Sequence, residues 1–353
     1  MYYIIAIIAF GLLIATHELG HFIAAKLMNV RVIEFAIGMG PKLLKKQGKE
    51  TLYSLRLLPF GGFCAMNEDE EAIDSRSFSA QKRIRRVFIL AAGGIANFIF
   101  AFIIVVILVT QMIGFGGSTV VGFMDGFPNE GENGLMAGDT IVSINKERIY
   151  YSEDFSLFMG LAEGHNVDLI VKRGNDLVRL DDFPLVRREY TVNGNTRMLY
   201  GLYFETIENS FIEGFQYSCY KTLNFVRIVR LSLAQLFTGN ADVTDMAGPV
   251  GMVDMMNTVG QSAPSVSYAI ADIAGFVALI GVNIAVLNLL PIPAMDGGRI
   301  FFIFVTWAIE KITKRRLNPK YERYINSTAL LLLIGLMVFI LINDITRIVS
   351  MRS

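Results

Sequence analysis

Apolar residues in this chain are gathered into four long runs that are separated by more polar stretches. Each run is long enough to cross the hydrocarbon core of a bilayer as an α-helix, which takes about 20 predominantly apolar residues. An amphipathic helix on a soluble protein would instead interleave polar residues along one face. We therefore predict transmembrane helices over residues 4–27, 87–113, 268–290 and 328–349.

The segments between these runs contain shorter patterns of apolar and polar residues. Residues 29–66 combine glycine–proline breaks with strand-like residues, which favours a membrane-associated β-hairpin or small sheet. Residues 114–190 contain short alternating stretches around a short amphipathic helix at 151–161, which indicates an inserted α+β domain. Phe211 to Phe237 has apolar residues at helical spacing with basic residues between them. An interfacial amphipathic helix and an ordinary packing helix both fit this last pattern.

The fold class that follows is a multi-pass α-helical membrane protein with about four transmembrane helices, a cytosolic-side β-hairpin or sheet and an inserted α+β domain. We expect four parts. They are a first membrane half (1–113), an extracytoplasmic domain (114–190), an amphipathic or interfacial connecting region (191–265) and a second membrane half (266–353).

Composition agrees with a membrane protein and excludes some other classes. Of the 353 residues, 53% are hydrophobic and only 18% are charged, which is apolar for a soluble protein. The formal net charge of zero gives no argument for nucleic-acid binding. The two cysteines, Cys64 and Cys219, are far apart and lack metal-type spacing, so no disulfide framework is expected. No basic residue precedes Lys26, so the first run is interpreted as a retained helix and not as a cleaved signal peptide.

The distribution of Lys and Arg predicts the orientation in the membrane. Residues 26–86 hold twelve of them and residues 299–323 hold seven, whereas residues 1–25 and 113–132 hold none. Basic loops stay on the cytosolic side. We therefore expect loops 28–86 and 299–325 in the cytosol, and both termini and the inserted domain outside, in a bacterial cell membrane.

The chemistry of the chain is concentrated in the first run, in the sequence His17-Glu18-Leu19-Gly20-His21. On a helix, His17 and His21 project from one face and can hold one Zn²⁺, while Glu18 can act as general base. Histidine and glutamate are costly within a membrane and are functional candidates there by default.

Two histidines do not complete a catalytic zinc site, which usually has three protein ligands. The remaining histidine, His165, lies in the inserted domain and is expected to be an ordinary turn residue. The third ligand should therefore be a carboxylate at membrane depth. We favour Asp296, because the prolines and glycines around it (Pro291 to Gly298) imply unwound backbone that frees its position. Asp272 is the alternative, but nothing near it loosens its helix.

Two further features stand out along the chain. Asn97 follows Gly93 and Gly94, small residues that permit close approach of helices; interhelical hydrogen bonding and substrate contact are about equally compatible with it. The acidic run at residues 68–71 is expected to be a solvated loop.

Taken together, these motifs resemble the site-2 protease family. The resemblance rests on His17–His21, on Phe35–Pro41, on Pro59–Phe63 and on Asn288–Gly298. In the inserted domain, Gly134–Ile141 resembles the signature of bacterial PDZ domains. The chain as a whole looks like a bacterial zinc metalloprotease of regulated intramembrane proteolysis with one extracytoplasmic PDZ domain.

The resemblance implies Zn²⁺ held by His17, His21 and Asp296, with Glu18 as general base. It also implies that Asn288 and Pro291, and with less support Asn97, position the substrate, and that residues near 52–63 pair with an unwound substrate as an added strand. One departure is Ala92-Gly93-Gly94, where the family usually has Ala-Gly-Pro. The implied substrates are single-span membrane proteins, either anti-sigma factors already cut outside or signal-peptide remnants.

Two other function classes compete with this one. A non-catalytic membrane scaffold would bind extracytoplasmic peptides through the PDZ-like domain, but the intact metalloprotease motif argues against it. A transporter built around a broken helix would show internal repeats, and the sequence shows none.

Overall fold

The computed structural model describes residues 1–67, 75–162, 166–192, 194–238, 248–314 and 320–352. The chain separates into two compact units. The first comprises Met1–Val109 and Gln216–Ser353, and the second comprises Thr110–Phe215. His165 and the acidic run 68–71 lie outside the described residues.

The first unit is built mainly of helices. Its elements are α1 (Tyr2–Leu27), α2 (Arg83–Thr110), most of α4 (Phe211–Thr238), α5 (Pro249–Ser262), α6 (Val266–Leu289), α7 (Asp296–Thr313) and α8 (Lys320–Arg352), together with the strands β1 (Val32–Gln47) and β2 (Leu52–Met66). Among the described residues, four helices are long and apolar enough to cross a membrane: Tyr2–Leu27, Arg83–Thr110, Val266–Leu289 and Tyr324–Thr346. The four apolar runs are helical to within a few residues of the predicted bounds, and the protein is a membrane protein.

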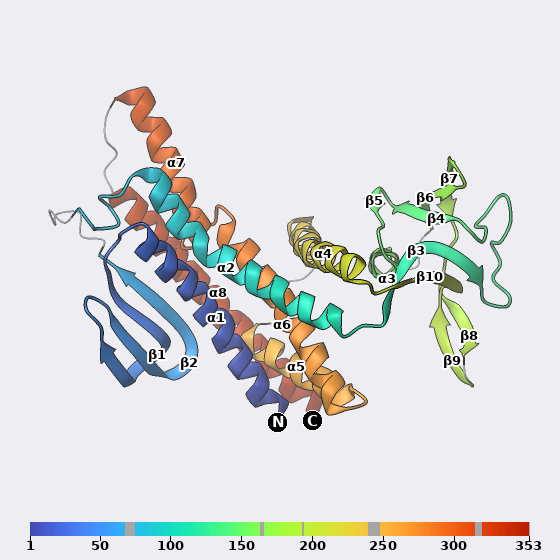
Figure 1. Ribbon diagram of the computed structural model, residues 1–353, viewed down its shortest axis with the longest axis horizontal. Helices are drawn as coiled ribbons and strands as arrows, with labels where there is room; N and C mark the ends of the chain where they lie inside the picture. Colours follow the sequence, from blue (N-terminus) through green and yellow to red (C-terminus); the bar gives the residue numbers. More distant parts are fainter. Residues whose placement is uncertain (68–74, 163–165, 193, 239–247, 315–319, 353) are drawn as a thin grey trace. The chain divides into compact units, whose positions relative to one another are not determined.

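Helices α1, α2, α5, α6, α7 and α8 of this unit lie side by side as a bundle (Figure 1). Buried residues of α1, α5 and α6, such as Leu13, Met256 and Val277, form one core cluster. A second cluster joins the end of α1 to α2 and α7 through residues such as Ala25, Leu90 and Ile303. Small residues allow the closest contact, because a Cβ added at Gly20 of α1 would lie 2.3 Å from the carbonyl oxygen of Ala92. This contact brings α2 against the face of α1 that carries the two histidines.

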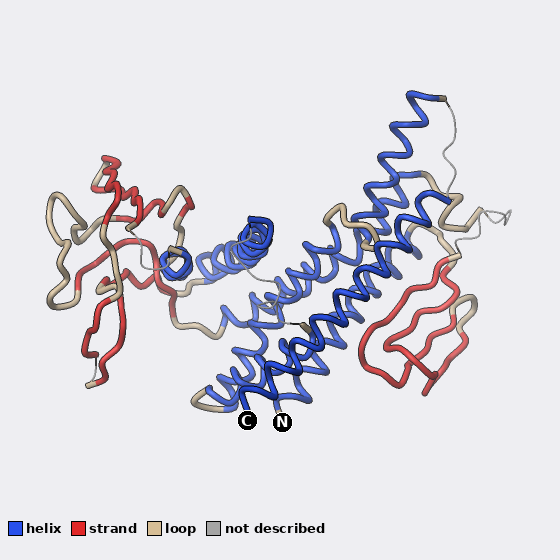
Figure 2. Tube along the Cα trace, turned by 180° about the vertical axis from the view of Figure 1, so that it is seen from behind, coloured by secondary structure: helices blue, strands red, loops and turns tan. Residues whose placement is uncertain are grey.

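Strands β1 and β2 form the predicted sheet beside α1, seen in red in Figure 2. The strands fold back on themselves, so that β1 and β2 provide four antiparallel segments. Segment 32–37 pairs with 62–66 on one side and with 52–55 on the other, and 52–56 also pairs with 42–47. The sheet therefore has two edges, formed by residues 42–47 and by residues 61–66.

The second unit is an α+β domain. Its strands are β3 (Gly114–Phe123), β4 (Thr140–Ile144), β5 (Glu147–Arg148), β6 (Val167–Arg173), β7 (Asp176–Phe183), β8 (Arg188–Val192), β9 (Asn195–Leu199) and β10 (Leu202–Glu208), and its helix is α3 (Ser152–Leu161). The main sheet has the order β10-β3-β4-β6-β7, with antiparallel pairs throughout, and β8 pairs with β9 separately. Because β10 pairs with β3, this unit continues beyond residue 190, where the sequence pattern placed its end.

The turn before β4 is fixed by a buried carboxylate. Asp139 is fully buried, and it accepts hydrogen bonds from the amide of Met136 at 2.8 Å and from Nε and an Nη atom of Arg173 at 2.9 and 2.8 Å. A buried carboxylate is tolerated when it is paired and hydrogen-bonded in this way. The Gly138-Asp139-Thr140 sequence, which is part of the PDZ-like signature, is therefore explained by the turn that it forms in this domain.

Candidate metal centre

The two motif histidines lie on one face of α1, four residues apart, as the helical spacing predicts. Their Nε2 atoms are 3.1 Å apart, and the rings meet edge to face with their centroids 4.7 Å apart. His21 is held by α2, since its Nδ1 lies 2.9 Å from the carbonyl oxygen of Ile89. A carbonyl only accepts hydrogen bonds, so Nδ1 carries the proton and Nε2 presents its lone pair.

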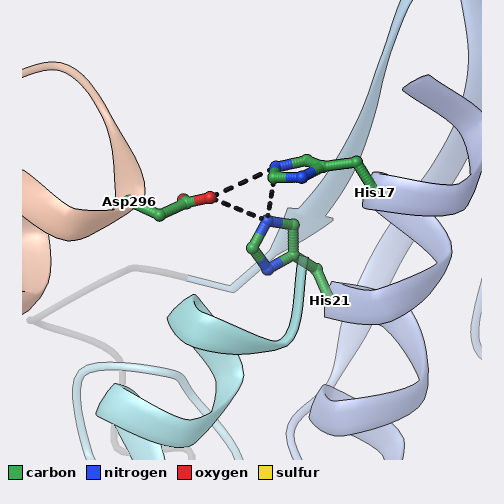
Figure 3. A group of neighbouring side chains, drawn as sticks. All are labelled: His17, His21 and Asp296. Carbon is green, nitrogen blue, oxygen red and sulfur yellow. Dashed lines mark hydrogen bonds and ion pairs between the residues drawn. The ribbon is translucent and has the colours of Figure 1, made fainter. Parts of the chain in front are cut away.

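Asp296 reaches this face from a distant part of the chain. It is the first residue of α7, after the non-helical residues 290–295 that end α6. Its Oδ2 lies 3.2 Å from Nε2 of both His17 and His21 (Figure 3). Of the described His, Cys, Asp and Glu residues, these are the three whose ligand atoms cluster closely enough to hold a metal ion, all within 4.8 Å of one another.

The glycines after Asp296 explain how the chain turns so sharply here. A Cβ at Gly297 would lie 2.1 Å from the carbonyl oxygen of Leu290, and one at Gly298 would lie 2.2 Å from that of Ile292. Ala294 has a positive φ of 72°, and its amide donates to Oδ1 of Asn326 in α8 at 3.2 Å. The loop is therefore folded tightly over the start of α7 and tied to α8.

The donor set fits zinc. Zinc–nitrogen and zinc–oxygen bonds of about 2.0–2.2 Å in a tetrahedral site place neighbouring donor atoms about 3.3 Å apart. The observed separations of 3.1–3.2 Å are close to this value. The three side chains are 13%, 8% and 18% exposed, so the site is shielded but open enough for water to enter.

Gly93 forms a wall of the site that the sequence analysis did not identify. A Cβ at this position would lie 2.4 Å from Nε2 of His21 and 2.7 Å from Cε1 of His17. No side chain other than hydrogen fits there without moving an imidazole. The sequence indicated only that Gly93 allows close helix packing, because a glycine carries no donor that would mark it as part of a metal site.

Glu18 lies between the three donors and the sheet. Its carboxylate interacts electrostatically with both histidines and with Asp296, and the backbone amide of Cys64 donates a hydrogen bond to it. Its Cγ is 3.2 Å from where a Cβ of Gly62 would be. Burial, together with the charge of Glu18, raises the pKa of the Cys64 thiol to about 12. Glu18 thus faces the sheet edge at residues 61–66.

The other residues singled out from the sequence are placed differently. Asn288 lies in the last turn of α6 and Pro291 is exposed in the loop that leads to Asp296. Asn97 is fully buried in α2, and within the described residues neither atom of its amide has a hydrogen-bond partner. Asp272 is exposed and is not part of the donor cluster.

Comparison with known proteins gives a consistent result. The family model described as Peptidase family M50 matches residues 5–336. A protein of Clostridium perfringens named as a zinc metalloprotease is 37% identical over 348 residues, which covers 98% of each chain. A similarly named protein of Clostridium acetobutylicum is 36% identical, covering 97% of this chain and 96% of the relative. The Bacillus subtilis protein named regulator of sigma-W protease RasP is 27% identical over 423 residues, covering 97% of each. The similarity therefore spans the donor cluster and both units.

Proposed function

Because this chain belongs to peptidase family M50, the site-2 proteases, and is a zinc metalloendopeptidase of the membrane, we propose that His17, His21 and Asp296 hold its zinc ion and that Glu18 is its general base. The observation that carries this assignment is the convergence of two imidazole nitrogens and one carboxylate oxygen from α1 and α7.

Zinc held by such a set lowers the pKa of a water molecule and polarises a carbonyl group. The residues of the chain supply the rest. Glu18 accepts the proton of the attacking water and returns it to the nitrogen of the leaving amine. The carbonyl of Ile89 keeps Nε2 of His21 free for the metal, as partners of ligating histidines usually do. Asn288 and Pro291 position the substrate backbone. Asn97 also helps to position the substrate, through its buried amide.

We infer that the substrate is an unwound transmembrane segment added to the sheet edge at residues 61–66. Residues near 52–63 are expected to pair with the substrate. Of these, residues 52–56 already pair with sheet segments on both sides, so they are not open to a substrate strand. The other edge carries Lys42, Lys45 and Lys46, and lysines on an edge strand discourage pairing with another chain. The edge at 61–66 instead carries small residues such as Gly61, Gly62 and Ala65, and it faces Glu18.

A helical substrate must unwind before cleavage, because its carbonyl groups are already hydrogen-bonded. The two histidines lie on one candidate membrane span, α1, and a second one, α2, packs against them, which favours single-span membrane proteins as substrates. We propose anti-sigma factors already cut outside, or signal-peptide remnants, as the two classes. In the second unit the antiparallel sheet with α3 packed on it is compatible with a PDZ-like domain that binds a peptide or limits access of bulky ectodomains.

The variant Glu18→Gln tests the mechanism. We expect the purified variant to retain about one zinc ion per chain and to lose cleavage of a single-span test substrate in detergent by at least about a hundredfold, which is the usual contribution of a general base. Asp272→Asn, which changes an exposed carboxylate on α6, is the matched control and should cleave at the normal rate. Continued cleavage by Glu18→Gln would contradict the assignment. Normal zinc content without cleavage in the wild type would favour the scaffold function instead.

A further inference from the structure

A cavity of about 640 Å³ lies between the start of α2 and α7, away from the donor cluster. Its rim carries Lys82, Arg83 and Arg86, and its apolar part is formed by residues such as Ile303, Phe304 and Trp307. None of the described residues that line it is acidic. Both helices belong to the first unit and run side by side at this end of the bundle (Figure 1).

The charge around this cavity is strongly positive. The first turn of α2 contains no acidic residue, so its basic residues lie at the positive end of the helix dipole, where cations are unfavourable. Glu310 of α7 pairs with Arg83 and offsets one charge. Lys82 remains exposed, and Lys311 lies 5.2 Å from the ring of Trp307. An anion bound among these groups would relieve their mutual repulsion.

The apolar side of the cavity matches an acyl chain. Phe304, Trp307 and Lys311 follow one another at helical spacing on α7, so two aromatic rings and a cation share one face of that helix. Phe304 is 52% exposed, Trp307 is 45% exposed and Ile84 of α2 is 71% exposed. The cavity also adjoins the end of a candidate membrane span, Arg83–Thr110. Tryptophan beside lysine at the end of a span is typical of the membrane–water interface.

We propose that this cavity binds the headgroup of an anionic phospholipid, with its phosphate among Lys82, Arg83 and Arg86 and the start of an acyl chain against Phe304 and Trp307. Arginine fits phosphate oxygens in a fork geometry, and basic pockets between membrane helices are suited to anionic headgroups. A soluble phosphate compound would satisfy the cations but would leave the aromatic face without a partner. The combination of both surfaces selects the lipid.

Trp307 allows a direct test, because it is the single tryptophan of the chain. The full-length protein is reconstituted in vesicles of phosphatidylcholine with a small, increasing fraction of brominated phosphatidylglycerol, and the quenching of tryptophan fluorescence is measured. Brominated phosphatidylcholine at the same bromine content is the reference. We expect half-maximal quenching at a severalfold lower fraction of the anionic lipid than of the neutral one.

The double variant Lys82→Gln/Arg83→Gln should raise the half-maximal fraction of phosphatidylglycerol by about fivefold for each cation removed. The single variant Lys82→Gln, at an exposed side chain, should show the smaller effect and guards against misfolding of the double variant. Lys45→Gln/Lys46→Gln removes the same charge from the sheet edge and should leave the quenching curve unchanged.

Three results would overturn the proposal. They are equal quenching by the two lipids, an equal loss in the Lys45→Gln/Lys46→Gln control, and displacement of the brominated lipid by millimolar inorganic phosphate, which would make the cavity a site for a soluble anion. None of these readouts depends on peptidase activity, so the proposal stands or falls separately from the catalytic assignment.

Discussion

The positions of the two histidine side chains depend on a neighbouring residue that forms no hydrogen bond with them. Gly93 of α2 packs directly on both imidazoles. Because its side chain is a single hydrogen atom, there is room for Nε2 of His21. Protein interiors do not absorb an added methyl group without shifts of side chains or backbone. The geometry of the metal donors is therefore set as much by the helix opposite as by the motif itself.

The variant Gly93→Ala should consequently lose zinc. Its methyl group would lie 2.4 Å from Nε2 of His21, so the ring must rotate or α2 must move away. We expect zinc content and cleavage of a test substrate to fall together by tenfold or more, on the order of effects seen when the support of a metal ligand is disturbed. Zinc is measured by elemental analysis of the purified protein.

Gly335→Ala is the control for this variant, because a Cβ at Gly335 of α8 meets nothing within 4 Å. It makes the same chemical change in a membrane helix and should keep both zinc and activity. A Gly93→Ala protein with full zinc content would show that the imidazoles are held in another way.

The sequence predicts candidate residues by their side chains and gives no sign of the backbone groups that hold these side chains in place. The spacing of His17, Glu18 and His21 predicts a metal site, and the cost of a carboxylate at membrane depth predicts Asp296 as its third ligand. In the structure, the ligand atoms of the two histidines and Asp296 lie within 4.8 Å of one another. The carbonyl of Ile89 and the amide of Cys64 left no signal, because every residue has such groups. Their roles follow from how α2 and the sheet pack on α1.

Among the elements, the sheet next to α1 contains its own charge network. Glu34 accepts hydrogen bonds from Ser54 at 2.7 Å, from Arg56 at 2.9 Å and from Lys42 at 3.0 Å, and these tie together three segments of the sheet. Burial by itself raises the pKa of Glu34, but the hydrogen bonds outweigh it and lower the pKa to about 2 from its ordinary 4.5.

The sheet should therefore weaken in acid. A carboxylate whose pKa is depressed in the folded state contributes stability above its unfolded pKa, and this is lost as the pH falls from about 4.5 towards 2. After screening by solvent we expect a contribution of roughly 1–3 kcal/mol. Hydrogen exchange of residues 52–56, corrected for the intrinsic pH dependence, should speed up over this range. In Glu34→Gln the exchange should already be faster at neutral pH and should not respond to acid; an identical acid response would contradict the role of Glu34.

A second buried carboxylate joins α8 to α5. Asp344 is fully buried, and its two oxygens accept from the amides of Gly248 at 3.2 Å and Gly251 at 2.7 Å, at the start of α5. A carboxylate at a helix N-terminus satisfies amides that lack partners within the helix and interacts favourably with the dipole.

Replacing Asp344 by Ala should lower the free energy of unfolding by about 2–4 kcal/mol, because it removes two charge-assisted hydrogen bonds and leaves buried amides unsatisfied. Asp344→Asn keeps one acceptor oxygen and should lose about half as much. Unfolding in mixed micelles with increasing denaturing detergent measures the difference. Asp272→Ala removes an exposed carboxylate from α6 and should change stability by less than about 0.5 kcal/mol. Equal stability of Asp344→Ala and the wild type would show that α5 is held otherwise.

The helices and strands themselves were predicted well where one pattern of apolar residues dominates a segment. The four apolar runs became helices, and the strand-like residues of 29–66 became a sheet. The way this sheet folds back, with 52–56 in its interior, depends on register, which glycine–proline breaks alone do not fix. Strand β10 was missed for a similar reason: its partner, β3, lies about 80 residues earlier in the chain, and short strands that pair at long range leave little local signal.

For the whole molecule, the number of membrane crossings and the distribution of charge lead to the same orientation. We propose that the four candidate membrane helices all cross the bilayer, which would place both termini on one side. The start of α1 and the end of α8 lie at the same end of the bundle (Figure 1). Of the twelve basic residues of 26–86, eight lie in the connection between the first and second of these helices, and the other four lie at the adjoining ends of the two helices. The seven of 299–323 lie between the third and the fourth. Such loops are retained in the cytosol. We therefore expect both termini and the second unit outside.

Reporter fusions test this orientation. Alkaline phosphatase, which is active only outside the cytosol, should be active when fused after Ser353 or inserted at Asn175, in the turn between β6 and β7. It should be inactive when inserted at Lys49, between β1 and β2. Green fluorescent protein, which matures in the cytosol, should give the opposite pattern at each position. Active phosphatase at Lys49 would reverse the orientation. It would also place the cavity between α2 and α7 on the outer face of the membrane, so these fusions decide which leaflet supplies the anionic lipid.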